Sequence, residues 1–153
     1  MRERIAAYKF RLRLEQNRLC SKFRMVEKAK PKAKAKYQIL VVDDEPTVCK
    51  AIQMMLKYYG HDVQIANDGV TALAAFEKGQ FDLVITDYLM PEMKGDELVT
   101  HLKRCRPEQR IILVTAFAED FLAYGKPTGG VNFVLNKPFS LEELKGAISK
   151  VMA

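Results

Sequence analysis

Three aspartates, one threonine and one lysine each follow a short apolar run, and side chains of these types together suit phosphoryl transfer. They are Asp43, Asp44, Asp87, Thr115 and Lys137. Carboxylates are natural ligands of Mg²⁺, which prefers hard oxygen atoms and keeps several waters. An ammonium and a hydroxyl suit the oxygens of a phosphoryl group in transfer. These residue types therefore predict phosphoryl transfer, provided that the fold brings them together.

The apolar runs before these residues indicate how the fold could do so. Each run is short and rich in β-branched side chains, which is typical of a buried strand. The runs cover residues 39–42, 83–85, 111–114 and 133–136. Helix-length segments separate them, so we expect a doubly wound α/β fold with a parallel sheet, in which ligands bind just outside the carboxyl ends of the strands.

The rest of the pattern supplies one more strand and the helices between strands. We expect the second strand at residues 62–66 and helices at about 46–59, from 69 onward, at about 96–104 and after Ser140. Ser140 and Glu143 form a capping box for the last helix. The fourth helix, at 119–124, has a helical composition, but Gly125, Pro127 and two further glycines follow at once and break its period.

Four motifs in order resemble the receiver domain of two-component response regulators, and the likeness runs from about Tyr37 to the C-terminus. The motifs are Val41-Val42-Asp43-Asp44-Glu45, Asp87-Tyr88-Leu89-Met90-Pro91 with Gly95, Thr115-Ala116, and Lys137-Pro138-Phe139. The resemblance implies a flavodoxin-like (βα)5 fold, whose five-stranded parallel sheet has the strand order 2-1-3-4-5. It also implies a Mg²⁺-dependent phosphoacceptor and not a turnover enzyme.

The resemblance gives each acidic residue a role. Asp87 becomes the nucleophile that forms an aspartyl phosphate. Asp44 ligates Mg²⁺ directly, Asp43 ligates it largely through water, and the backbone carbonyl of Leu89 is a further ligand. Taken singly, an aspartate in such a place is usually a cap, so one of Asp43 and Asp44 could cap the first helix, and capping and metal binding can both hold.

The other two residues also have plainer interpretations. A threonine is most often a strand former and a lysine a solvated surface residue. By resemblance, Thr115 hydrogen-bonds a phosphoryl oxygen, and Lys137, joined to Pro138 by a cis peptide, contacts the phosphoryl group. One departure concerns the switch aromatic that the family often has three residues before the lysine. Val134 stands there, and the neighbouring Phe133 should face the other side of its strand.

Charge divides the chain into two parts. Residues 1–36 hold 13 Lys and Arg against 3 Glu, a balance of +10, whereas residues 37–153 hold 12 against 16, a balance of −4. We expect 1–36 to be a basic extension, partly helical or disordered, that ends in a Lys/Ala linker, and 37–153 to be the receiver domain. Ile5, Leu12 and Leu19 are among the apolar residues at helical spacing in the extension.

The predicted function is that of a single-domain response regulator. It would take a phosphoryl group from a sensor histidine kinase or a histidine phosphotransfer protein and act on an unknown downstream protein, since the chain ends just after the fifth helix. No apolar stretch is long enough to span a membrane, no secretory signal is evident, and the three cysteines lack a metal-binding pattern, so we expect a cytoplasmic protein.

Three alternatives remain open. An aspartate-nucleophile phosphohydrolase would need a second aspartate two residues after the nucleophile, where this chain has Leu89. Nucleic-acid binding could come only from the basic extension. Finally, Met25 could be the true start, and residues 1–24 would then not belong to the native protein.

Overall fold

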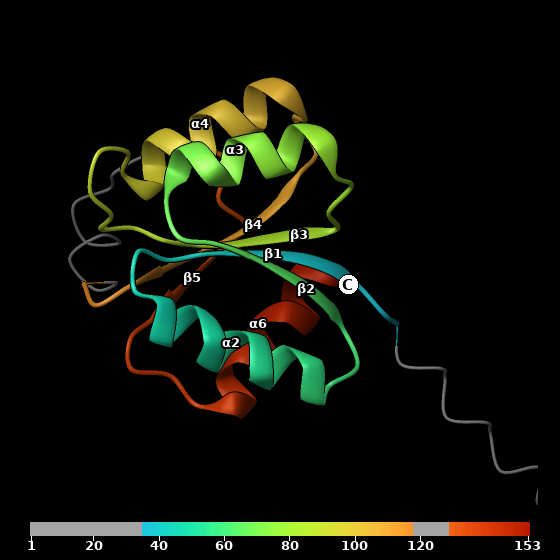
Figure 1. Cartoon of the computed structure of the whole chain (residues 1–153). Helices are drawn as coiled ribbons and strands as arrows, with labels where there is room; N and C mark the ends of the chain where they lie inside the picture. Colours follow the sequence, from blue (N-terminus) through green and yellow to red (C-terminus); the bar gives the residue numbers. More distant parts are fainter. Residues whose placement is uncertain (1–34, 118–128) are drawn as a thin grey trace, which may run out of the picture. The chain divides into compact units, whose positions relative to one another are not determined.

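The computed structural model describes residues 35–117 and 129–153, and these form a parallel sheet between two layers of helices (Figure 1). The strands are β1 (Gln38–Val42), β2 (Asp62–Ala66), β3 (Leu83–Asp87), β4 (Arg110–Thr115) and β5 (Phe133–Asn136). The helices are α2 (Pro46–Tyr58), α3 (Gly69–Lys78), α4 (Gly95–Cys105) and α6 (Leu141–Met152). The expected fourth helix and the stripe of Ile5, Leu12 and Leu19 lie outside the described residues.

The strand order is β2-β1-β3-β4-β5, which confirms what the resemblance to receiver domains implies, and all pairs are parallel. The register brings the predicted polar residues to one edge. Val42 pairs with Thr86, so Asp43 and Asp87 come next to each other on neighbouring strands. Asp87 in turn pairs with Val114, and Thr115 pairs with Asn136, directly before Lys137.

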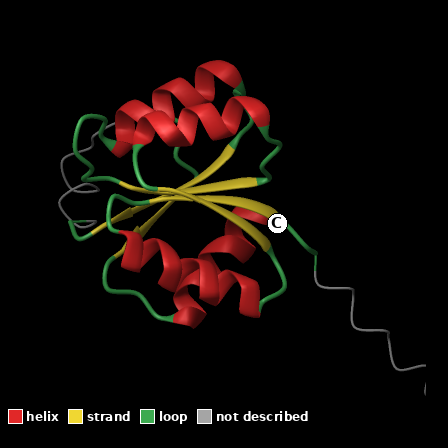
Figure 2. Ribbon diagram, viewed as in Figure 1, coloured by secondary structure: helices red, strands yellow, loops and turns green. Residues whose placement is uncertain are grey.

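Alternate residues of the strands enter two apolar cores, one on each face of the sheet (Figure 2). On one face, Ile39 and Val41 pack with α2 and α6. On the other face, Leu40 and Val42 pack with α3 and α4. Burial on both faces explains why the strands are continuous apolar runs, because parallel strands covered by helices have no solvated side.

Local sequence signals set where helices begin and end. Asp68 caps α3 by accepting a hydrogen bond from the amide of Thr71, 2.6 Å away. The predicted capping box of α6 is confirmed, since Ser140 and Glu143 each accept a hydrogen bond from the other's backbone amide. Gly60 follows α2 with a φ of +88°, the left-handed conformation that glycine adopts without strain.

Candidate functional site

The ammonium of Lys137 joins two carboxylates at the carboxyl edge of the sheet. Its Nζ lies 2.7 Å from Oδ2 of Asp43 and 2.8 Å from Oδ1 of Asp87. Asp43 follows β1, Asp87 ends β3 and Lys137 follows β5, so three strands supply one ion-pair cluster. Three of the predicted site residues are thus in direct contact.

Asp43 is also held by the turn that leads into α2. Its Oδ1 accepts a hydrogen bond from the amide of Glu45, 2.9 Å away, and the residue is almost fully buried. Glu45 occupies the N-cap position, so the alternative that Asp43 or Asp44 caps this helix is wrong. Asp44 comes next in the chain but is exposed, at the rim of the cluster.

The electrostatics of the cluster reflect burial of like charges. Burial raises the pKa of Asp87, and the nearby charge of Asp43 raises it further, while the hydrogen bond to Lys137 acts in the opposite direction. Burial lowers the pKa of Lys137, but its contacts with both carboxylates outweigh burial and hold that pKa above the usual value. The cluster therefore carries more negative charge than its single ammonium neutralises.

Thr115 is buried at the end of β4, one residue beyond the pairing partner of Asp87. Its hydroxyl oxygen accepts a hydrogen bond from the amide of Phe117, 3.1 Å away. Because the oxygen is the acceptor in that bond, the hydroxyl proton is free to be donated elsewhere. The register thus brings a hydroxyl group to the same edge of the sheet as Asp87, and the role of Thr115 stays a prediction.

Two exposed apolar side chains lie on the loops that follow β3 and β4. Leu89, two residues after Asp87, is 50% exposed, and Phe117, two residues after Thr115, is 55% exposed. Both loops leave the carboxyl edge of the sheet, where Asp87 and Thr115 end their strands.

Gly95 allows the loop after Asp87 to fold back tightly. Its amide donates a hydrogen bond to the carbonyl of Tyr88, at 2.9 Å. A Cβ at position 95 would collide with the carbonyl oxygen of Asp87 and lie 2.9 Å from the Cα of Tyr88. Only glycine fits here, because the backbones approach too closely for a side chain.

The donor set of the cluster fits a divalent cation. Asp43 and Asp87 present buried carboxylates, Asp44 adds an exposed one, and hard oxygen ligands of this kind suit Mg²⁺. Within residues 35–117 and 129–153, no three His, Cys, Asp or Glu side chains already form a metal-binding group. Oxygens of both buried carboxylates instead bind the Lys137 ammonium, which supplies part of the charge that a cation would add.

One contact of the site was not predicted from the sequence. Cys49 of α2 is fully buried, and its thiol lies 3.4 Å from the carbonyl oxygen of Asp43. Burial, together with the charge of Asp43, raises the pKa of Cys49 to about 11, so it is a protonated thiol at neutral pH. Nothing in the spacing of a single cysteine on a helix could indicate this contact.

Comparison with known proteins identifies the family. Residues 39–149 match the response regulator receiver domain, so this chain belongs to that family. The family consists of phosphoacceptors of two-component signalling and not of turnover enzymes, which removes the support for a small-molecule phosphohydrolase. Membership implies a histidine kinase as partner and a domain that binds Mg²⁺.

Individual relatives agree with this assignment. The chain is 38% identical over 108 residues to TcrX of Mycobacterium tuberculosis, a probable transcriptional regulatory protein, and this match covers 69% of this chain but 45% of TcrX. It is 35% identical over 120 residues to the chemotaxis protein CheY-3 of Vibrio cholerae, covering 74% of this chain and 90% of CheY-3. The match to the sensor kinase CckA of Brucella abortus covers 12% of that protein.

A solved structure with a bound metal is also similar. The response regulator TrrA of Thermotoga maritima, determined in complex with Mg²⁺ and BeF, is 32% identical with a TM-score of 0.69, and the match covers 76% of this chain and 99% of TrrA. No helix in the described part of the chain is long and apolar enough to cross a membrane.

Proposed function

We propose that Asp87 is the phosphoacceptor of a single-domain response regulator that acts in the cytoplasm. The observation that carries this proposal is the Lys137 ammonium, which lies within 2.8 Å of carboxylate oxygens on both Asp43 and Asp87. An ammonium held there can contact an oxygen of a phosphoryl group on Asp87 without a large movement. The carboxylate is buried enough to be shielded and still lies at the surface edge of the sheet.

The phosphoryl group would come from a phosphohistidine on a sensor kinase or a phosphotransfer protein. A carboxylate oxygen of Asp87 forms a bond to phosphorus while the bond from phosphorus to the donor imidazole nitrogen breaks, and the electron pair stays on that nitrogen. The transition state spreads charge over three phosphoryl oxygens. Lys137 compensates that charge as a cation, and Thr115 donates its free hydroxyl proton to one oxygen.

Asp43, Asp44, Asp87 and the backbone carbonyl of Leu89 would hold Mg²⁺. The cation, when bound, neutralises the carboxylates and the phosphoryl oxygens. The raised pKa of Asp87 supports this assignment, because it shows that Lys137 alone does not offset burial beside Asp43.

Acetyl phosphate tests the assignment of Asp87 directly. After incubation with acetyl phosphate and Mg²⁺, we expect the unaltered protein to gain the mass of one phosphoryl group by intact mass spectrometry. Asp87→Asn should gain none, because an amide is not an anionic nucleophile. Asp96→Asn, at an exposed aspartate in the first turn of α4, is the matched control and should be labelled normally. A base-labile adduct on Asp87→Asn would place the acceptor elsewhere.

Nucleic acid is a second candidate partner, favoured only by the charge of +10 on residues 1–36. Binding through that extension should weaken steeply as salt is raised, because counterions are released from the phosphate backbone. Absence of DNA binding at low salt, or binding insensitive to salt, would remove this candidate.

A further inference from the structure

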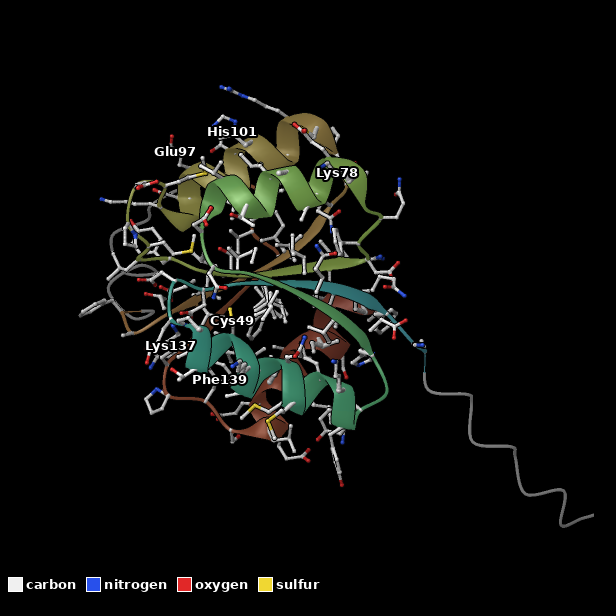
Figure 3. All side chains as sticks on the ribbon, viewed as in Figure 1. Cys49, Lys78, Glu97, His101, Lys137 and Phe139 are labelled. Atoms are coloured by element: carbon white, nitrogen blue, oxygen red, sulfur yellow. The ribbon has the colours of Figure 1, made fainter. Side chains whose placement is uncertain are left out.

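We infer that Cys49 is a positioning residue for the acidic pair Asp43 and Asp44, acting through the peptide group between them. The inference rests on the proposed Mg²⁺ site. The Cys49 side chain is fully buried, and besides its apolar neighbours it contacts a polar group of the site, the backbone carbonyl of Asp43. Figure 3 shows Cys49 between β1 and α2, below the carboxyl edge of the sheet.

The backbone of Asp43 is hydrogen-bonded to residues at the end of β2. Its amide donates a hydrogen bond to the carbonyl of Ala66, at 3.3 Å. Its carbonyl oxygen lies 3.4 Å from both the thiol of Cys49 and the side-chain amide nitrogen of Asn67. The thiol also lies 3.7 Å from the carbonyl of Ala66, so it sits between the two backbone segments.

These contacts matter because the carbonyl of Asp43 belongs to the peptide that leads into Asp44. Fixing that oxygen fixes the plane of the peptide, since the peptide group is rigid. The plane in turn sets the direction in which Asp44 leaves the backbone. Asp44 is exposed, so packing does not constrain its carboxylate, and the backbone below it must orient the residue.

The carboxylate of Asp43 is held by contacts as well. One carboxylate oxygen accepts from the amide of Glu45 and the other contacts Lys137, at 2.9 and 2.7 Å. With both carboxylate oxygens and both backbone polar groups engaged, Asp43 has little freedom left. Cys49 adds a constraint from the buried face of α2, and through it the position of the helix is coupled to that of the acidic pair.

Mg²⁺ affinity of paired substitutions tests this role. Cys49→Ala removes the donor and Cys49→Ser keeps one, and both reduce the volume of the side chain. By calorimetric titration at a temperature where all variants are folded, we expect Cys49→Ala to bind Mg²⁺ about tenfold more weakly, as loss of an outer hydrogen-bonding partner commonly does. Cys49→Ser should recover most of the affinity, and Cys105→Ser, at an exposed thiol, should match the unaltered protein.

Asn67→Ala provides a second test at an exposed position, where folding is not at risk. It removes the other donor to the Asp43 carbonyl and should also weaken Mg²⁺ binding. Equal affinity of Cys49→Ala, Cys49→Ser and the unaltered protein would overturn the positioning role while leaving the metal site intact. Failure of the unaltered protein to bind Mg²⁺ would overturn the metal site itself and, with it, this role.

Discussion

Lys137 is the residue on which the charge balance of the site depends. Its ammonium contacts the carboxylates of Asp43 and Asp87, which come from the neighbouring strands β1 and β3. In the chain, 94 residues separate Lys137 from Asp43. A cation that binds both carboxylates must compete with this ammonium or share them with it. An incoming phosphoryl group offers the ammonium a new partner, so phosphorylation and release of the carboxylates to the metal should favour each other.

The lifetime of the phosphorylated state should depend on Leu89 and Phe117. Leu89 lies two residues after Asp87 and Phe117 two after Thr115, and both are apolar and about half exposed. Neither can orient an attacking water by hydrogen bonding, and Phe117 is bulky enough to shield a phosphorus atom that it reaches. We expect Leu89→Asn combined with Phe117→Glu to speed loss of phosphate roughly tenfold in Mg²⁺ buffer, because oriented water reacts faster. Phosphate release after removal of acetyl phosphate measures it. An unchanged rate in the double variant would show that shielding by these side chains does not control hydrolysis.

At the scale of elements, Arg106 joins the ends of two helices. It follows α4, and its Nη2 donates to the carbonyls of Phe76 and Gly79 at the end of α3, at 3.0 and 2.7 Å. Its guanidinium also lies 4.2 Å from the ring centroid of Phe76. A cation here satisfies carbonyls that a helix leaves unpaired at its C-terminus.

We expect Arg106→Ala to lower the free energy of unfolding by about 2 kcal/mol, because hydrogen bonds from a charged donor are lost. Arg106→Lys should recover little, since a compact ammonium lacks the planar guanidinium group that stacks on the Phe76 ring. Urea denaturation measures both variants against Arg104→Ala, an exposed neighbour in the last turn of α4. Full stability of Arg106→Lys would show that charge alone is sufficient.

The start of α4 is weaker than its end. Lys94 occupies the N-cap position and makes no side-chain capping bond to the described residues. A lysine there also places positive charge at the positive end of the helix dipole. We expect Lys94→Asn to raise the free energy of unfolding by about 1 kcal/mol, because asparagine caps well. Lys94→Gln is the control, since it removes the same charge without supplying a good capping side chain. Equal stabilisation by Lys94→Gln would mean that loss of charge, and not capping, is responsible.

The sequence predicts these elements well where the signal is local. The strands are continuous β-branched runs, and the capping box at Ser140 lies within four residues, so both could be recognised without a structure. The convergence of Asp43, Asp87, Thr115 and Lys137 followed from parallel strand order. The contacts of Arg106 and Cys49 could not be predicted, because they join segments through backbone carbonyls that leave no trace in residue spacing.

At the scale of the whole molecule, the candidate site and the point where the chain enters the fold lie at opposite edges of the sheet. Asp87 lies at the carboxyl edge, whereas the chain enters β1 at the amino edge, where Lys36 pairs with Asp62 at 2.9 Å. There the amide of Tyr37 donates to Nδ1 of His61, and the amide of Gln38 donates to Asp82. The point at which the basic extension joins the domain is thus anchored at the opposite edge of the sheet from Asp87, the proposed phosphoacceptor.

Removal of residues 1–35 should leave the receiver fold and its phosphorylation intact. Every residue of the candidate site and both apolar cores lie after Lys36, and the contacts that anchor Lys36, Tyr37 and Gln38 are retained. We expect the truncated protein to melt cooperatively and to gain one phosphoryl group from acetyl phosphate at the rate of the full chain. Thermal unfolding and a time course by intact mass measure this, with truncated Asp87→Asn as the unlabelled control. A truncated protein that melts without cooperativity, or is labelled more slowly, would show that the extension packs on the domain or helps to form its site.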